Sequence, residues 1–129
     1  MTQPVREPAE AVFESGPDGL VVRLRGTTNF AWFKAQMLQA IAVVRATAPR
    51  SVLIDFRDLT MPLTDFDRYD LGVMAVGPGL AMPIATVGSA ATIDPKRLGE
   101  MVARNRGGNV RVFTDYDEAR AWLREQLDK

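Results

Sequence analysis

The sequence predicts an α/β fold: a mostly parallel five-stranded sheet with an antiparallel edge strand, covered by helices. Short apolar runs alternate with segments whose apolar residues recur every three or four positions, which is typical of strands alternating with amphipathic helices. The 129 residues suffice for one hydrophobic core, and 47% hydrophobic with 25% charged residues is an ordinary globular composition. We therefore expect the element order β-β-α-β-α-β-α-β-α.

The first half of the chain supplies a hairpin, a helix, a strand and a second helix. Residues 11–14 and 20–25 are extended runs joined by a turn rich in glycine, proline and aspartate. A helix with the apolar stripe Phe30, Phe33, Met37, Ile41 and Val44 follows and ends before Pro49. Residues 51–56 form a buried strand, and residues 57–63 a loop. The next helix begins at Thr64 or Asp65, and its predicted inner stripe is Phe66, Tyr69, Val73 and Val76.

The second half repeats the alternation of strand and helix. Residues 82–87 form a buried strand, and a loop over residues 88–93 leads to Asp94 and Pro95, which predict a helix cap and a first helical position. Leu98, Met101 and Val102 form the inner face of that helix. Residues 110–113 form the last strand, and residues 115–118 have the pattern of a capping box. The last helix faces the core with Ala119, Trp122, Leu123 and Leu127.

The chain divides into a flexible N-terminal tail, residues 1–10, and a single domain, residues 11–129. The tail has no apolar signal-peptide core, so we expect a cytoplasmic protein. Residues 71–93 are uncharged and long enough to span a bilayer, but glycines and prolines interrupt them. We therefore expect a helix end, a turn and a buried strand here rather than a membrane span.

Charge and residue usage exclude several function classes. Lysine plus arginine and aspartate plus glutamate both number 16, so no basic excess favours nucleic acid. The sequence has no cysteine and no histidine, which removes thiolate chemistry, imidazole bases and the usual transition-metal ligands. We expect no catalytic residues, no cofactor and no metal site, and we favour a protein that is not an enzyme.

Two segments resemble a known family. The strand at residues 51–56 with its following loop and helix, and the strand-to-helix ending at residues 110–123, resemble the SpoIIAA-like group of the STAS and Sec14-type folds, as found in small bacterial proteins. The resemblance covers nearly the whole chain. It implies a SpoIIAA-like fold and a binding or regulatory module that acts on a regulatory protein partner or a small ligand.

In anti-anti-sigma proteins of this group, the loop after the central strand has aspartate, a phosphorylatable serine or threonine, glycine and leucine. Residues 58–67 lack that pattern, and Thr60 and Thr64 are the only hydroxyl side chains nearby. Thr64 is the candidate phosphoacceptor, although Asp65 and Asp67 would repel a phosphate there.

A candidate anion site lies at the carboxyl ends of the parallel strands, where loops and helix N-termini meet. We place Lys96 and Arg97 in the first turn of their helix, where the helix dipole disfavours cations and a bound anion would offset that cost. The alternative is that both side chains point into water and Asp94 compensates at the cap. The predicted ligand-binding side chains are Ser89, Thr92, Lys96, Arg97, Arg57 and Thr60.

Apolar side chains off the predicted core stripes indicate an interface. Trp32 lies opposite the apolar stripe of its helix, Leu71 and Met74 lie off theirs, and Leu80 lies in a neighbouring loop. Tryptophan and methionine are favoured at interfaces, so these residues predict a homo-oligomer, most simply a dimer. The alternative is that other segments of the same chain cover them.

The leading hypothesis from the sequence is therefore a non-enzymatic, self-associating module that binds a protein or a small ligand. The alternative is an enzyme or carrier for a small anionic or lipid-like molecule in the crevice at the strand carboxyl ends.

Overall fold

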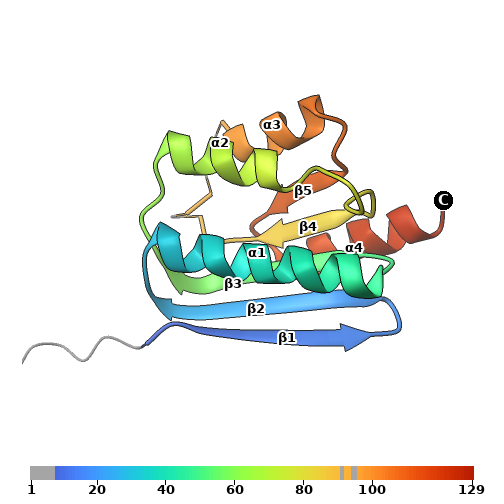
Figure 1. Ribbon diagram of the computed structural model, residues 1–129, viewed down its shortest axis with the longest axis horizontal. Helices are drawn as coiled ribbons and strands as arrows, with labels where there is room; N and C mark the ends of the chain where they lie inside the picture. The colour runs from blue at the N-terminus through green and yellow to red at the C-terminus, as the bar shows by residue number, and fades with distance from the viewer. Residues whose placement is uncertain (1–7, 91, 94–95) are drawn as a thin grey trace, which may run out of the picture.

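The computed structural model describes residues 8–90, 92–93 and 96–129, and these form one five-stranded sheet with four helices (Figure 1). In chain order the elements are β1 (Glu10–Gly16), β2 (Gly19–Thr27), α1 (Phe30–Thr47), β3 (Val52–Thr60), α2 (Asp65–Met74), β4 (Ile84–Val87), α3 (Leu98–Asn105), β5 (Val110–Phe113) and α4 (Tyr116–Leu127). The strand β1 pairs antiparallel with β2, and the other neighbours are parallel. The predicted fold class and element order are confirmed.

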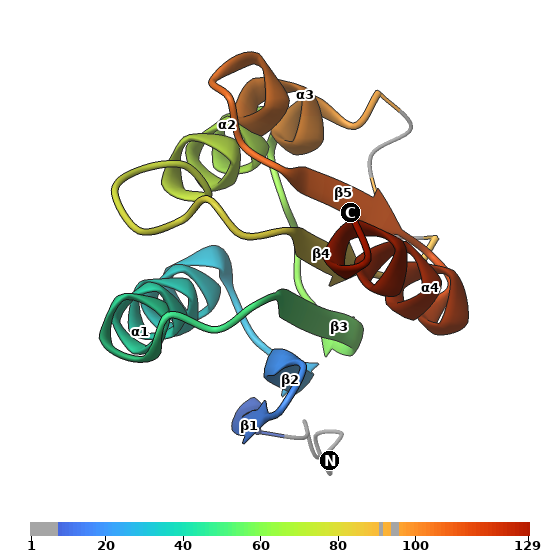
Figure 2. The same cartoon turned by 90° about the vertical axis from the view of Figure 1, so that its right-hand side faces the viewer.

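The strands lie side by side in the order of the sequence, β1-β2-β3-β4-β5. Crossovers between parallel strands are right-handed in nearly all proteins, so strands added in one direction place their connecting helices on one face. Figure 2 shows α1, α2 and α3 on one side of the sheet. The helix α4 follows the last strand, and it covers the opposite face, where it packs on β3, β4 and β5.

Each face of the sheet has its own apolar cluster. Toward α1, α2 and α3, the cluster contains Leu20, Val22, Phe33, Val44, Ile54 and Ile84 among its buried residues. Toward α4, the buried cluster contains Leu53, Ala85, Val87, Phe113, Ala119 and Leu123. Along β2, Leu20, Val22 and Leu24 are buried while Arg23 and Arg25 are exposed, because successive side chains of a strand point to opposite faces.

The predicted inner stripe of α2 is wrong at Phe66 and Tyr69, while Val76, just after the helix, packs against the core. Phe66 is 76% exposed and Tyr69 is 42% exposed, whereas Leu71 and Met74 pack against the core. The reason is the crossing of α2 with α3: a Cβ atom at Gly72 would lie 2.5 Å from the backbone oxygen of Gly99. That close approach turns the face with Gly72 inward, and a helical wheel of α2 alone contains no information about α3.

The element boundaries differ most from prediction at the end of β3 and the start of α3. The strand β3 continues to Thr60, four residues beyond Phe56, because after a register shift in β2 it pairs again up to Thr27. The helix α3 begins at Leu98 instead of Pro95, since Arg97 has a left-handed backbone with φ of 51° that a right-handed helix cannot continue through. The predicted cap and first position, residues 94–95, lie outside the described residues, as do residues 1–7 of the predicted tail.

Within the described part of the chain, no helix combines the length and the apolar character needed to cross a membrane.

Candidate functional site

A cavity of about 160 Å³ lies between the sheet and the layer of α1, α2 and α3. Its walls come from α1, from the pair α2 and α3, and from the parallel strands β3, β4 and β5, and they are almost entirely apolar. The apolar lining includes Phe33, Met37, Ala40 and Val44 of α1, Ile54 and Phe56 of β3, Leu71, Met74 and Ala75 at α2, Ile84 of β4, and Val110 and Val112 of β5. Because protein interiors are otherwise close-packed, an apolar space of this size is a candidate binding site.

Small residues and helix placement explain why the space stays open. Gly72 holds α2 tightly against α3, so these two helices form a close pair. The facing walls have short side chains at Ala40 and Ala75, which leave room between α1 and α2. Polar contacts at the surface then hold α1 and α2 together, with Lys34 Nζ 2.7 Å from Asp70 Oδ2. The packing therefore leaves a gap between α1 on one side and the pair α2 and α3 on the other.

One part of the cavity lining is polar and includes Arg68, Thr92, Arg97 and Glu100. Arg68 comes from the first half of α2, and its guanidinium donates to the backbone oxygens of Leu63 at 3.2 Å and Thr92 at 3.4 Å. Only Asp65 places a carboxylate near Arg68 among the described residues, at 3.5 Å, and the Asp65 side chain is 74% exposed.

Glu100 is the buried carboxylate of this polar part. It lies between two arginines of α3 and its cap, 3.5 Å from Arg97 Nη1 and 3.4 Å from Arg104 Nη1. Arg97 also donates to the backbone oxygen of Val112 at 2.8 Å, which ties the start of α3 to β5. The left-handed backbone of Arg97 is uncommon for a residue with a side chain, and here it directs the chain into α3.

The structure brings together part of the predicted anion site. The Ser89 and Thr92 hydroxyls lie 3.1 Å apart, and Thr92 and Arg97 line the same cavity. The placement of Lys96 and Arg97 in the first helical turn is wrong, because both precede Leu98 and Arg97 is the cap residue.

The other two predicted anion-site residues lie elsewhere. Arg57 points to the α4 side of the sheet, where it contacts Asp55 and Tyr116. Thr60 ends β3 instead of lying in a loop, and its backbone oxygen accepts from the Thr28 amide at 3.0 Å. The predicted site therefore does not form as one group of six side chains.

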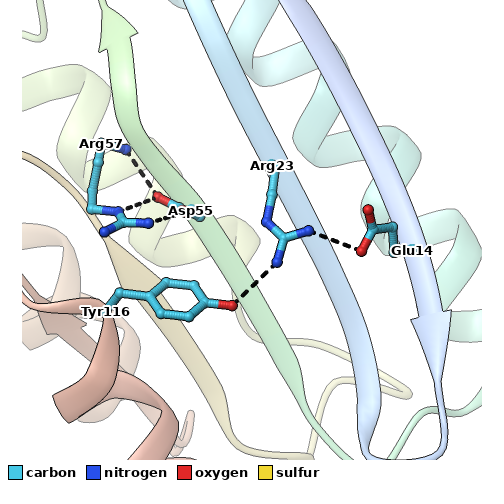
Figure 3. A network of polar contacts seen from close by, with 5 residues as sticks. All are labelled: Glu14, Arg23, Asp55, Arg57 and Tyr116. Atoms are coloured by element: carbon cyan, nitrogen blue, oxygen red, sulfur yellow. Dashed lines mark hydrogen bonds and ion pairs between the residues drawn. The ribbon is translucent and has the colours of Figure 1, made fainter.

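A polar network on the opposite face of the sheet joins five side chains (Figure 3). Arg23 donates to Glu14 at 2.9 Å and to the Tyr116 hydroxyl at 3.3 Å, and the Arg57 guanidinium lies 4.7 Å from the centre of the Tyr116 ring. The hydrogen bond to Tyr116 is the main cause that raises the pKa of Arg23 above its ordinary value. These contacts neutralise charges on the part of the sheet beside α4.

The pair Asp55 and Arg57 anchors this network. Burial by itself raises the pKa of Asp55, but hydrogen bonds from the Arg57 side chain and amide outweigh burial, so the pKa lies below its ordinary value. The hydrogen bond to Asp55 in turn raises the pKa of Arg57. Both groups stay charged and paired at neutral pH, so this pair has a structural role.

The candidate phosphoacceptor Thr64 is the cap residue of α2 and is exposed. Its Oγ1 accepts from the Asp67 amide at 3.1 Å, and the Asp67 carboxylate accepts from the Thr64 amide at 3.0 Å. Phosphorylation of Thr64 stays a prediction, and the structure adds that its hydroxyl oxygen already caps the helix.

The interface candidates have varied surroundings within the chain. Trp32 is half-buried and packs against the core. Leu71 and Met74 line the cavity, and Leu80 is buried and lines it too. A role for these four side chains in self-association stays a prediction.

Two polar residues of the cavity, Arg68 and Glu100, were not predicted as site residues. The signal for Arg68 is its spacing, since it lies three, four and seven positions before Leu71, Gly72 and Ala75 and so shares their helix face. Glu100 lies three positions after Arg97 and four before Arg104, a spacing that allows two ion pairs on one helix face.

Comparisons with known proteins agree with this architecture. No family model matches the sequence, and no curated protein matches it. The structure is similar to that of an anti-sigma factor antagonist from Mycobacterium paratuberculosis, at 16% identity and a TM-score of 0.61, over 96% of this chain and 99% of the other. It is also similar to an uncharacterized DUF3478-family protein with a SpoIIAA-like fold from Shewanella loihica PV-4, at 18% identity and a TM-score of 0.51, over 95% and 98% of the two chains. The chain therefore has the SpoIIAA-like fold that residues 51–56 and 110–123 predicted.

Proposed function

We propose that this protein is a non-enzymatic binding module that holds a small apolar molecule in the cavity between the sheet and α1, α2 and α3. The apolar cavity is the observation that supports the proposal. Its volume of about 160 Å³ is close to that of apolar cavities, of roughly 150 Å³, that bind benzene. The expected ligand is therefore one aromatic ring or a short alkyl chain.

The chemistry of the cavity favours binding over catalysis. The chain has no histidine or cysteine. Within the polar part, the Thr92 hydroxyl bonds to the Ser89 hydroxyl and donates to the Ser89 backbone oxygen at 3.1 Å. A nucleophilic hydroxyl needs an adjacent base to be activated. The alternative from the sequence is an enzyme or carrier for a small anionic or lipid-like molecule in the crevice at the strand carboxyl ends, the region from which Thr92 and Arg97 line the cavity.

Titration with a neutral, soluble aromatic compound tests the proposal. Benzyl alcohol added to isotopically labelled protein should shift the NMR signals of cavity residues such as Met37 and Ile54 in a saturable way. Ala40→Leu should abolish these shifts, because the larger side chain occupies the cavity. Ala35→Leu on the exposed side of the same helix should leave them unchanged.

Thermal unfolding of each variant checks that Ala40→Leu is folded, and Ala75→Leu on the facing wall provides a second way to fill the space. If wild-type cavity signals stay unmoved up to the solubility limit of benzyl alcohol, the proposal is wrong.

We also propose that the module acts on a regulatory protein in the cytoplasm and self-associates. One structure with this fold is an anti-sigma factor antagonist, and that name motivates the regulatory partner. Self-association rests on Trp32, which is half-buried in the single chain. Size-exclusion chromatography at high protein concentration tests self-association. The wild-type protein should elute as a dimer, and Trp32→Ala should elute with a larger share of monomer. A wild-type protein that elutes strictly as a monomer would refute self-association.

A further inference from the structure

We infer that the ligand of the cavity is an apolar carboxylate whose negative group pairs with Arg68. This inference rests on the proposed function, since it assigns the ligand class of the same cavity. It starts from the surroundings of Arg68 and from the balance of charges at the polar part of the lining.

Arg68 is a largely buried cation with little compensation. Its side chain is 20% exposed and lines the cavity. Its two backbone acceptors, Leu63 and Thr92, are neutral. The Asp65 carboxylate is 3.5 Å away and mostly in water, where solvent screens the attraction. A guanidinium removed from water without a close counter-charge is costly, so this position favours an anion.

The neighbouring charges do not remove that preference. Glu100 is the buried carboxylate of the lining, and Arg97 and Arg104 share it. The described charged residues that line the cavity are Arg68, Arg97 and Glu100, and Glu100 pairs with Arg97 and not with Arg68. A cationic ligand would meet repulsion from Arg68, and a neutral ligand would leave the exposed Asp65 as the described counter-charge of Arg68.

Size and charge then define the ligand class. The apolar walls admit one ring or a short chain, and the Arg68 guanidinium, whose described counter-charge is the solvent-screened Asp65, can pair with one negative charge. A carboxylate supplies that single charge and can accept two parallel hydrogen bonds from the planar guanidinium, a bidentate geometry. A phosphate monoester has close to two charges at neutral pH and would exceed this balance. Benzoate is therefore a suitable probe.

The test compares benzoate with benzyl alcohol, which has the same ring and no charge, by NMR titration at neutral pH. In the wild-type protein benzoate should bind at least about tenfold more tightly, the range expected for a hydrogen bond to a charged group. Arg68→Gln should reduce to near unity the ratio of the benzoate and benzyl alcohol affinities measured in that same variant. Arg68→Lys keeps the positive charge but cannot form the bidentate hydrogen bonds of a guanidinium, so it should retain part of the preference for benzoate.

Arg111→Gln is the matched control, because Arg111 is exposed on β5 beside Phe113 of the α4 cluster and its loss changes the net charge equally. Equal binding of the two probes to wild type would overturn the inference and leave the proposed function standing. Binding of neither probe would overturn both. An equal loss of preference in Arg111→Gln and Arg68→Gln would also overturn the inference, since net charge alone would explain it.

Discussion

Arg57 Nη2 lies 2.8 Å from Asp55 Oδ2, and Arg57 Nε lies 2.9 Å from Asp55 Oδ1, so the two side chains form a bidentate ion pair along one strand. Asp55 is 8% exposed in its side chain, while Arg57 is 41% exposed. Residues two apart on a strand point to the same face, which is why this pairing is possible. The pair lies at the α4 side of the sheet, away from the cavity.

Replacing Asp55 by asparagine should lower the free energy of unfolding at pH 7 by about 1–2 kcal/mol, because Arg57 loses a charged acceptor but remains partly solvated. The pKa of Asp55 is lowered in the folded protein, so this stability is present above the ordinary value of 3.8. It is lost as the pH falls through the lower folded value. The difference between wild type and Asp55→Asn should therefore shrink below pH 3.8.

Urea unfolding across this pH range measures the effect. Asp58→Asn is the control, since Asp58 is exposed on the same strand and should have little effect. A difference that stays constant from neutral to acidic pH would contradict the assigned role of the Asp55 carboxylate.

The ion pair between Lys34 of α1 and Asp70 of α2 should contribute a small, salt-dependent coupling. Lys34 is 41% exposed and Asp70 is 27% exposed, so solvent screens much of the attraction. A double-mutant cycle with Lys34→Gln and Asp70→Asn should give about 0.5 kcal/mol at low salt and less at about 1 M salt. A coupling that does not change with salt would indicate packing instead of charge.

Gly72→Ala should destabilise the protein, although alanine is the better helix former. The added Cβ would lie 2.5 Å from the Gly99 oxygen and 2.8 Å from the Val102 Cβ, so α2 and α3 would have to separate. We expect a loss of about 1–2 kcal/mol in denaturant unfolding. Gly16→Ala, whose Cβ would be 3.9 Å from its nearest neighbour, is the control and should change stability by no more than about 0.5 kcal/mol. Stabilisation by Gly72→Ala would refute the close crossing.

Thr64→Ala should cost about 1 kcal/mol, because the Asp67 amide loses its acceptor at the start of α2. Thr64→Ser keeps the hydroxyl and should restore most of the stability. Thermal unfolding of the two variants gives the comparison. If serine is as destabilising as alanine, the capping oxygen is not the cause.

Much of the site region was predictable from local signals, and part was not. The hydroxyls of Ser89 and Thr92 and the arginine at position 97 follow from loops at the carboxyl ends of strands. Arg57 comes from the same region of the sequence, yet it faces α4, because alternation along β3 places Arg57 on the same side as Asp55. Arg68 went unpredicted because its helix face was assigned from Phe66 and Tyr69, which the structure places at the surface.

The sequence by itself determined the alternation of strands and helices and the capping of α2 and α4, because these follow from local periodicity and capping residues. The SpoIIAA-like fold class came from the resemblance of residues 51–56 and 110–123 to that group. Only the tertiary structure decided which face of α2 is buried, where α3 begins and that a cavity remains beneath the helices. Those features depend on contacts between distant segments, such as Gly72 against Gly99 and Arg97 against Val112. No pattern within one element specifies such contacts, because they arise from packing energies between elements.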